Sequence, residues 1–72
     1  MSKALEAKVL VNEALLHSLI THASLGKALS QVFSDNYSEL TRRLTLKPPV
    51  DYELLKELSE AFKYANSRLP RR

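Results

Sequence analysis

The chain has 72 residues, a formal net charge of +3 and no cysteine. This length allows one domain with a small core, and the absence of cysteine excludes disulfides and thiolate metal sites as stabilising elements. We therefore expect a single helical domain over residues 1–72, stabilised by close helix packing or by self-association.

The positive charge is concentrated at the C-terminus. Arg68, Arg71 and Arg72 lie in the last five positions, and the remaining basic residues balance the eight acidic ones. We expect residues 69–72 to form a flexible basic tail. A nucleic-acid-binding domain usually carries its surplus charge on one face or along one helix, so this distribution does not favour that class.

No segment of the sequence predicts a membrane partner. The longest uncharged run covers residues 14–26, which is shorter than the roughly 20 residues that a spanning helix needs. Glu6 and Lys8 interrupt any apolar region of the kind that a signal peptide requires. The expected location is the cytoplasm.

Residues 2–22 are predicted to form a helix that begins after the N-cap Ser2 and carries two apolar stripes. The large-residue stripe alternates spacings of four and three, as in a coiled coil, and consists of Leu5, Val9, Asn12, Leu16, Leu19 and, at its end, Ala23. The small-residue stripe consists of Ala4, Ala7, Val11, Ala14 and Ser18. Only the strip of residues 3, 6, 10, 13, 17 and 21 is predicted to face solvent.

A helix that is apolar on most of its circumference is buried on most of it. The rest of the chain can cover one stripe, so we expect a homodimer packed through the large-residue stripe. The alternative is a monomeric bundle with this helix at its centre. Asn12 either pairs with its counterpart and fixes the register, or lies at the edge of the stripe with its amide in water.

Two further helices are predicted over residues 24–33 and 36–46. The first has apolar residues at helical spacing from Leu25 to Phe33, and the second continues from Tyr37 to about Leu46. Residues 34–36, Ser-Asp-Asn, favour a turn between them. One long helix stays an alternative, because the apolar stripe also runs unbroken through residues 25–44.

The last helix is predicted over residues 51–68. Pro48 and Pro49 end the preceding helix, and Asp51 caps the new one. Its apolar residues lie within one arc and its charged residues on the other side. The sequence thus predicts an all-α fold, a compact bundle of three to four helices.

The sequence shows no catalytic, cofactor or metal site. His17 and His22 are five residues apart, which turns them away from each other on a helix, and no glycine-rich phosphate loop is present. We therefore expect a non-enzymatic protein.

DNA binding is the main alternative function. Residues 25–46 have the outline of a helix-turn-helix, with candidate DNA contacts at Ser38, Thr41, Arg42, Arg43 and Lys47. Against this interpretation, the turn lacks glycine, and Asp35 and Glu39 would face the same polyanion.

Binding to a protein is the favoured function, because the first helix has an excess of apolar surface and no other site is evident. We expect a small regulatory or adaptor protein. Tyr52 and Tyr64 lie off the apolar stripe of the last helix and are candidate partner contacts, as aromatic anchors often are. Each could equally cover the edge of the core.

Overall fold

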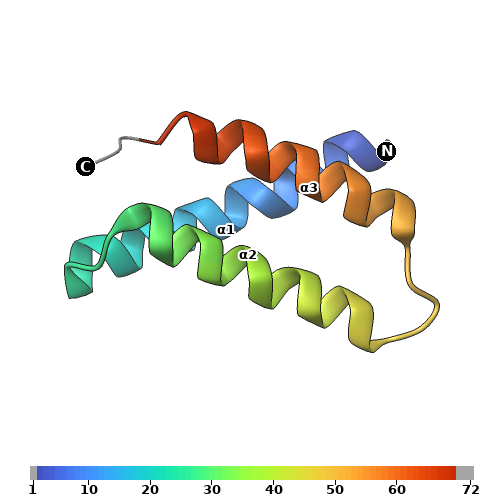
Figure 1. Ribbon diagram of the computed structural model, residues 1–72, viewed down its shortest axis with the longest axis horizontal. Coiled ribbons are helices and arrows are strands. Elements are labelled where there is room, and N and C mark those ends of the chain that lie inside the picture. Colours follow the sequence, from blue (N-terminus) through green and yellow to red (C-terminus); the bar gives the residue numbers. More distant parts are fainter. Residues whose placement is uncertain (1, 70–72) are drawn as a thin grey trace.

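The computed structural model describes residues 2–69, which form three α-helices (Figure 1): α1 (Lys3–Leu25), α2 (Leu29–Leu46) and α3 (Tyr52–Ser67). The all-α prediction is confirmed. In Figure 1, α1 lies behind α2 and α3 and packs along both, whereas α2 and α3 contact each other less extensively. Residues 70–72, most of the predicted basic tail, lie outside the described residues. Leu69, which we assigned to that tail, packs against the core.

Helix α1 extends three residues beyond its predicted end at residue 22. It begins after Ser2, whose Oγ accepts a hydrogen bond from the Leu5 amide at 3.1 Å. It ends at Gly26, which adopts φ 70° and donates its amide hydrogen to the His22 carbonyl. A left-handed glycine at this position is a common helix terminator. Gly26 therefore ends α1, and the helix predicted from residue 24 begins only at Leu29.

Helix α2 is continuous, so the predicted turn at residues 34–36 is wrong. Ser34 and Asp35 are exposed, and Gln31 donates a hydrogen bond to the Asp35 carboxylate one turn away. Asn36 instead points towards α1, where its amide donates to Ser18 Oγ at 2.8 Å. Asp and Asn favour turns in isolation. Here Asp35 accepts a hydrogen bond from within α2, and Asn36 donates one to α1, so these contacts override the local preference.

The small-residue stripe of α1 forms the intramolecular face from Ala7 onwards, whereas Ala4 at its start is exposed. Ala7, Val11 and Ser18 are fully or almost fully buried, and small side chains let α2 and α3 approach closely. Leu10, predicted to face solvent, is partly buried against the core. The buried apolar residues of the described chain are Ala7, Val11, Val32, Phe33, Leu54 and Leu58.

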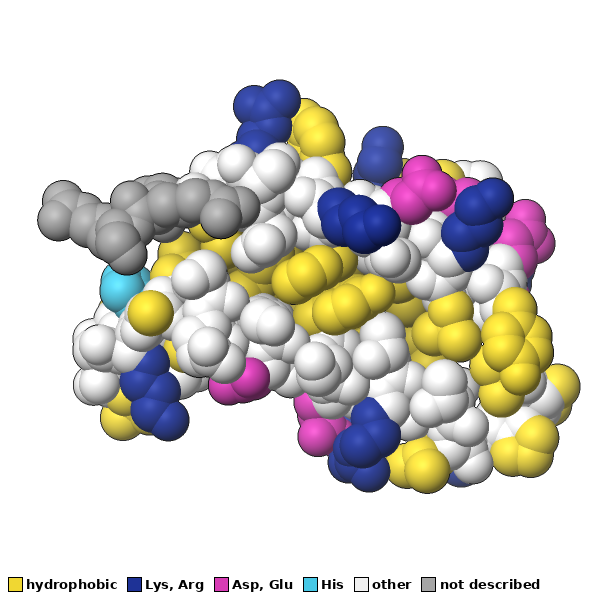
Figure 2. Space-filling view, viewed as in Figure 1, with side chains coloured by type: hydrophobic (Ala, Val, Ile, Leu, Met, Phe, Trp, Pro, Cys, Tyr) yellow, Lys and Arg dark blue, Asp and Glu magenta, His cyan; other side chains and the backbone are white. Residues whose placement is uncertain are grey.

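Aromatic rings join α2 to α3. Phe62 lies 4.9 Å from Phe33 and stacks on Tyr37 at 4.1 Å, measured between ring centroids. Figure 2 shows the apolar band that runs between α2 and α3 on the face in view. Such ring pairs stabilise a fold beyond their buried area, and here they close the contact between the two helices that touch least.

Helix α3 begins where the sequence predicted. Asp51 is its N-cap, with Oδ1 accepting from the Leu54 amide at 3.0 Å. The same carboxylate forms an ion pair with Lys3 at the start of α1. One side chain thus ends the proline-containing loop, caps α3 and ties α3 to the first turn of α1.

Replacing Asp51 by alanine is expected to lower the melting temperature by about 4–8 °C, the usual effect of losing a helix cap in so small a domain. Asp51→Asn is the matched control, because asparagine also caps helices but cannot form the ion pair. It should lower the melting temperature less.

The ion pair also predicts a pH dependence. The hydrogen bond from Lys3, and then that from the Leu54 amide, hold the pKa of Asp51 below its ordinary value. The stabilisation is therefore present above the unfolded pKa of about 3.9 and is lost as the pH falls through the lower folded value. Thermal unfolding should show the difference between the wild type and Asp51→Asn shrinking below about pH 4. A constant difference would mean that the carboxylate charge contributes nothing.

Candidate interaction surface

The side of α1 that turns away from the core is apolar and exposed. We call this surface the outer face of α1: it is the large-residue stripe together with Ile20. Its leucine, valine and isoleucine side chains are between 44% exposed, at Leu19, and 59% exposed, at Ile20. Asn12, in the middle of the stripe, is exposed as well.

The outer face and the buried face lie on nearly opposite sides of α1. At about 100° per residue, the outer face occupies an arc of roughly 100°, centred about 150° away from Ser18. Within residues 2–69 no other element covers it. The single chain therefore does not form the alternative arrangement, in which α1 would be enclosed on both stripes.

A groove of about 540 Å³ borders the outer face on the α3 side. It lies between α1 and α3 and is lined by Ala4, Lys8, Glu57, Glu60, Ala61 and Tyr64. Lys8 stands at the boundary between this groove and the outer face. No ion pair joins Lys8 to any of residues 2–69.

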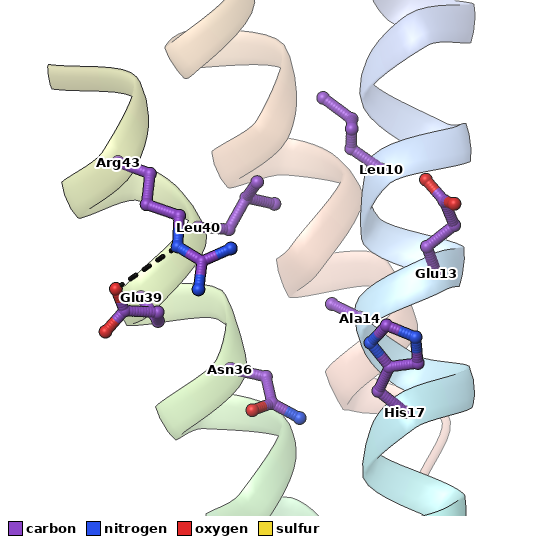
Figure 3. A pocket seen from close by; sticks show the side chains of 8 residues that line it. All are labelled: Leu10, Glu13, Ala14, His17, Asn36, Glu39, Leu40 and Arg43. Atoms are coloured by element: carbon purple, nitrogen blue, oxygen red, sulfur yellow. Dashed lines mark ion pairs between the residues drawn. The ribbon is translucent and has the colours of Figure 1, made fainter. Parts of the chain in front are cut away.

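A second groove, of about 290 Å³, borders the outer face on the α2 side (Figure 3). Glu13 and His17 project into it from α1, opposite Asn36, Glu39 and Arg43 of α2. Arg43 Nε lies 3.4 Å from the Glu39 carboxylate. Glu13 is not part of an ion pair within the described chain.

This second groove has the chemistry of a charged surface. Arg42, and more weakly Arg43, hold the pKa of Glu39 below its ordinary value, so this carboxylate stays ionised at neutral pH. Residues 2–69 contain no group of three or more His, Asp or Glu side chains placed to hold a metal ion. The groove presents charged side chains, and nothing that lines it is arranged as a nucleophile with a base.

Four of the candidate DNA contacts lie on α2, and the fifth, Lys47, follows its last residue. Because α2 is continuous, residues 25–46 do not contain the turn between two helices that the helix-turn-helix interpretation required. Arg42 and Arg43 both form ion pairs with Glu39. Thr41 donates its hydroxyl to the Ser38 carbonyl at 2.9 Å, and Lys47 is the C-cap of α2.

The structure does not bring Tyr52 and Tyr64 together. They are 75% and 64% exposed, and their spacing along α3 places them about 120° apart around the helix axis. Tyr64 lies under the Arg68 guanidinium at 4.8 Å and lines the groove beside Lys8. Tyr64 therefore lines the groove that borders the outer face of α1, and Tyr52 lines neither of the two grooves.

Ile20 is the member of the outer face that the sequence analysis missed. It follows Leu16 by four residues, which places the two side chains on neighbouring turns of one face. Its position just outside the alternating spacing of the large-residue stripe kept it out of the predicted interface.

No helix within residues 2–69 is both long enough and apolar enough to cross a membrane. Comparisons with models of protein families, with curated proteins and with solved structures found no match to this chain.

Proposed function

We propose that this chain is a small, non-enzymatic regulatory or adaptor protein of the cytoplasm. It acts by binding a protein target, as a homodimer packed through the outer face of α1. The observation that carries this proposal is the exposure of Leu5, Val9, Leu16, Leu19 and Ile20 on one side of a helix whose other side forms the core.

The small core supports self-association. Six apolar side chains are buried within residues 2–69, and as many large ones stand exposed on α1. Burying ten half-exposed aliphatic side chains from two copies would contribute on the order of 10 kcal/mol before the costs of association. Those costs are about 4–15 kcal/mol, so the burial offsets them only towards the lower end of that range, where a net gain of about 6 kcal/mol corresponds to a dissociation constant of about 40 µM.

A second copy of the chain fits this surface. The stripe has coiled-coil spacing, so its residues can interdigitate with the same residues of another copy. A two-fold dimer uses one self-complementary patch on both subunits. Association through α1 also leaves α2 and α3 on the outside of the assembly, where a protein target can reach them.

Sedimentation equilibrium over about 1–100 µM, a range that brackets moderate affinity, tests the homodimer. We expect the mass to rise from that of one chain, 8.2 kDa, towards twice that value. A single species of 8.2 kDa throughout this range would refute the homodimer.

The tyrosines provide a test of target binding. A target captured by the wild-type dimer, purified and titrated back should bind the variant Tyr52→Ala/Tyr64→Ala at least about tenfold more weakly, since exposed tyrosines are frequent binding hot spots. The two single variants would show which side of α3 is used. Unchanged affinity in the double variant, with dimerisation intact, would exclude both tyrosines from the target interface.

The arginines provide a test against DNA binding. We expect no binding of the wild type to random duplex DNA in fluorescence anisotropy, even at low salt. Arg42→Ala/Arg43→Ala should leave dimerisation and target binding unchanged. If the wild type instead bound DNA with the steep salt dependence of counterion release, and the variant did not, the protein would be a DNA-binding regulator.

A further inference from the structure

We infer that the two α1 helices of the dimer run parallel and in register, with Lys8 of each subunit paired to Glu13 of the partner subunit. This inference rests on the proposed homodimer and specifies its geometry. It follows from the charged residues that flank the outer face and from the position of Asn12 within that face.

The spacing of the large-residue stripe defines a heptad register. Leu5, Asn12 and Leu19 occupy the d positions, and Val9, Leu16 and Ala23 the a positions. The flanking g positions on the α3 side are then Lys8, Leu15 and His22. The flanking e positions on the α2 side are Glu6, Glu13 and Ile20.

A parallel pair of helices makes the flanking contacts of Lys8 and Leu15 favourable. In this arrangement each g residue faces the e residue five positions further along the partner. Lys8 therefore faces the partner's Glu13, and Leu15 faces the partner's Ile20. Lys8 and Glu13 are both exposed and lack an ion pair within residues 2–69, so both are available for this contact.

An antiparallel pair makes the charged contacts unfavourable. With full overlap, Leu5 lies opposite Ala23 of the partner subunit, e residues face e residues, and g residues face g residues. Glu13 then faces the partner's Glu13 near the symmetry axis. Lys8 faces the partner's His22 and finds no carboxylate there. The like charges of the two Glu13 side chains oppose association.

Asn12 independently favours the parallel arrangement. Residues at the same position meet across the axis of a parallel dimer, so the two Asn12 amides can each donate and accept a hydrogen bond. In the antiparallel arrangement Asn12 lies against the partner's Leu16. Its amide would be covered without a polar partner, which is costly. A lone asparagine at an a position selects one register in this way, and Asn12 presents the same amide at a d position.

Neighbouring side chains within one subunit leave Lys8 and Glu13 available for ion pairs with the partner subunit. Lys8 shares its groove with Glu57 and Glu60, and Glu13 shares its own with His17, Glu39 and Arg43. Arg43 is already paired with Glu39, as Figure 3 shows. The partner's opposite charge therefore approaches each side chain from the open side of its groove.

Disulfide cross-linking tests the orientation, since the chain has no cysteine of its own. We expect Leu5→Cys alone, and Ala23→Cys alone, to oxidise to covalent dimers. In an antiparallel dimer two copies of residue 5 would be about 27 Å apart along the axis, far beyond the reach of a disulfide. Thr45→Cys, exposed on α2, is the control for random collision.

A mixture of the two cysteine variants tests the antiparallel orientation, because that orientation brings residue 5 of one chain next to residue 23 of the other. Cross-links between a Leu5→Cys chain and an Ala23→Cys chain, with none in either variant alone, would show an antiparallel dimer and overturn the inference. A monomer in sedimentation would instead refute the proposed homodimer. A dimer that cross-links in none of these experiments would exclude the outer face of α1 as the interface. It would overturn both the proposed homodimer interface and the parallel orientation.

Charge exchange tests the ion pair. Glu13→Lys and Lys8→Glu should each raise the dimer dissociation constant about tenfold, because each change turns two attractive contacts per dimer into repulsive ones. The double exchange Lys8→Glu/Glu13→Lys should restore affinity to within about threefold of the wild type. In an antiparallel dimer Glu13→Lys would have little effect, since one like-charged pair would replace another.

Discussion

The variant Leu16→Glu is expected to be monomeric and still folded. Leu16 lies at the centre of the outer face and is 58% exposed in the single chain, so a glutamate there meets water and costs the isolated fold little. In the dimer the same carboxylate would be covered by the partner without a counter-charge. We expect the dissociation constant to rise at least about 100-fold, with an unchanged helical circular dichroism spectrum.

A matched control is Leu46→Glu. Leu46 is 64% exposed and lies at the end of α2, away from the outer face of α1. This variant makes the same chemical change at an equally exposed leucine and should dimerise like the wild type. If Leu16→Glu stayed dimeric, the outer face would not be the interface. If both variants became monomeric, dimerisation would depend on general hydrophobicity.

The variant Phe33→Ala is expected to unfold at room temperature or to lose most of its stability. Phe33 is the largest fully buried side chain, and it packs against Phe62 where α2 meets α3. Removing a buried phenylalanine costs about 3–5 kcal/mol. That is most of what a core of this size supplies. Urea unfolding followed by circular dichroism would measure the loss.

The control for this change is Tyr52→Ala, which removes an aromatic ring that is largely exposed. It should change the free energy of unfolding by no more than about 0.5 kcal/mol. A Phe33→Ala variant with the same unfolding midpoint as the wild type would mean that the core is formed elsewhere.

Elements with strong local signals could be predicted from the sequence. The loop before α3 contains Pro48 and Pro49, which cannot continue a helix, and Asp51 supplies its own cap. Both features act within a few residues, so no tertiary information was needed. The two stripes of α1 were likewise evident, because they follow from residue spacing alone.

The continuity of α2 could not be predicted in this way. Asn36 favours a turn in isolation, and only the nearby Ser18 of α1 gives its amide a partner within a helix. The residue at which α1 ends was equally hard to predict, because Gly26 can lie in the first turn of one helix or terminate the helix before it. Leu10 was placed in solvent because the exact direction in which α2 packs on α1 is not encoded in the periodicity of α1.

The hydrogen bond between Asn36 and Ser18 also restricts how α1 and α2 can slide along each other. A surface of small side chains offers few obstacles to a shift by one turn, about 5.4 Å. A shift in one of the two directions would place Asn36 near Ala14, whose side chain offers no hydrogen-bonding group. The amide would then lose a hydrogen bond worth about 0.5–1.5 kcal/mol. This single polar contact therefore opposes a slide in that direction, which packing of small apolar side chains alone would leave nearly equal in energy.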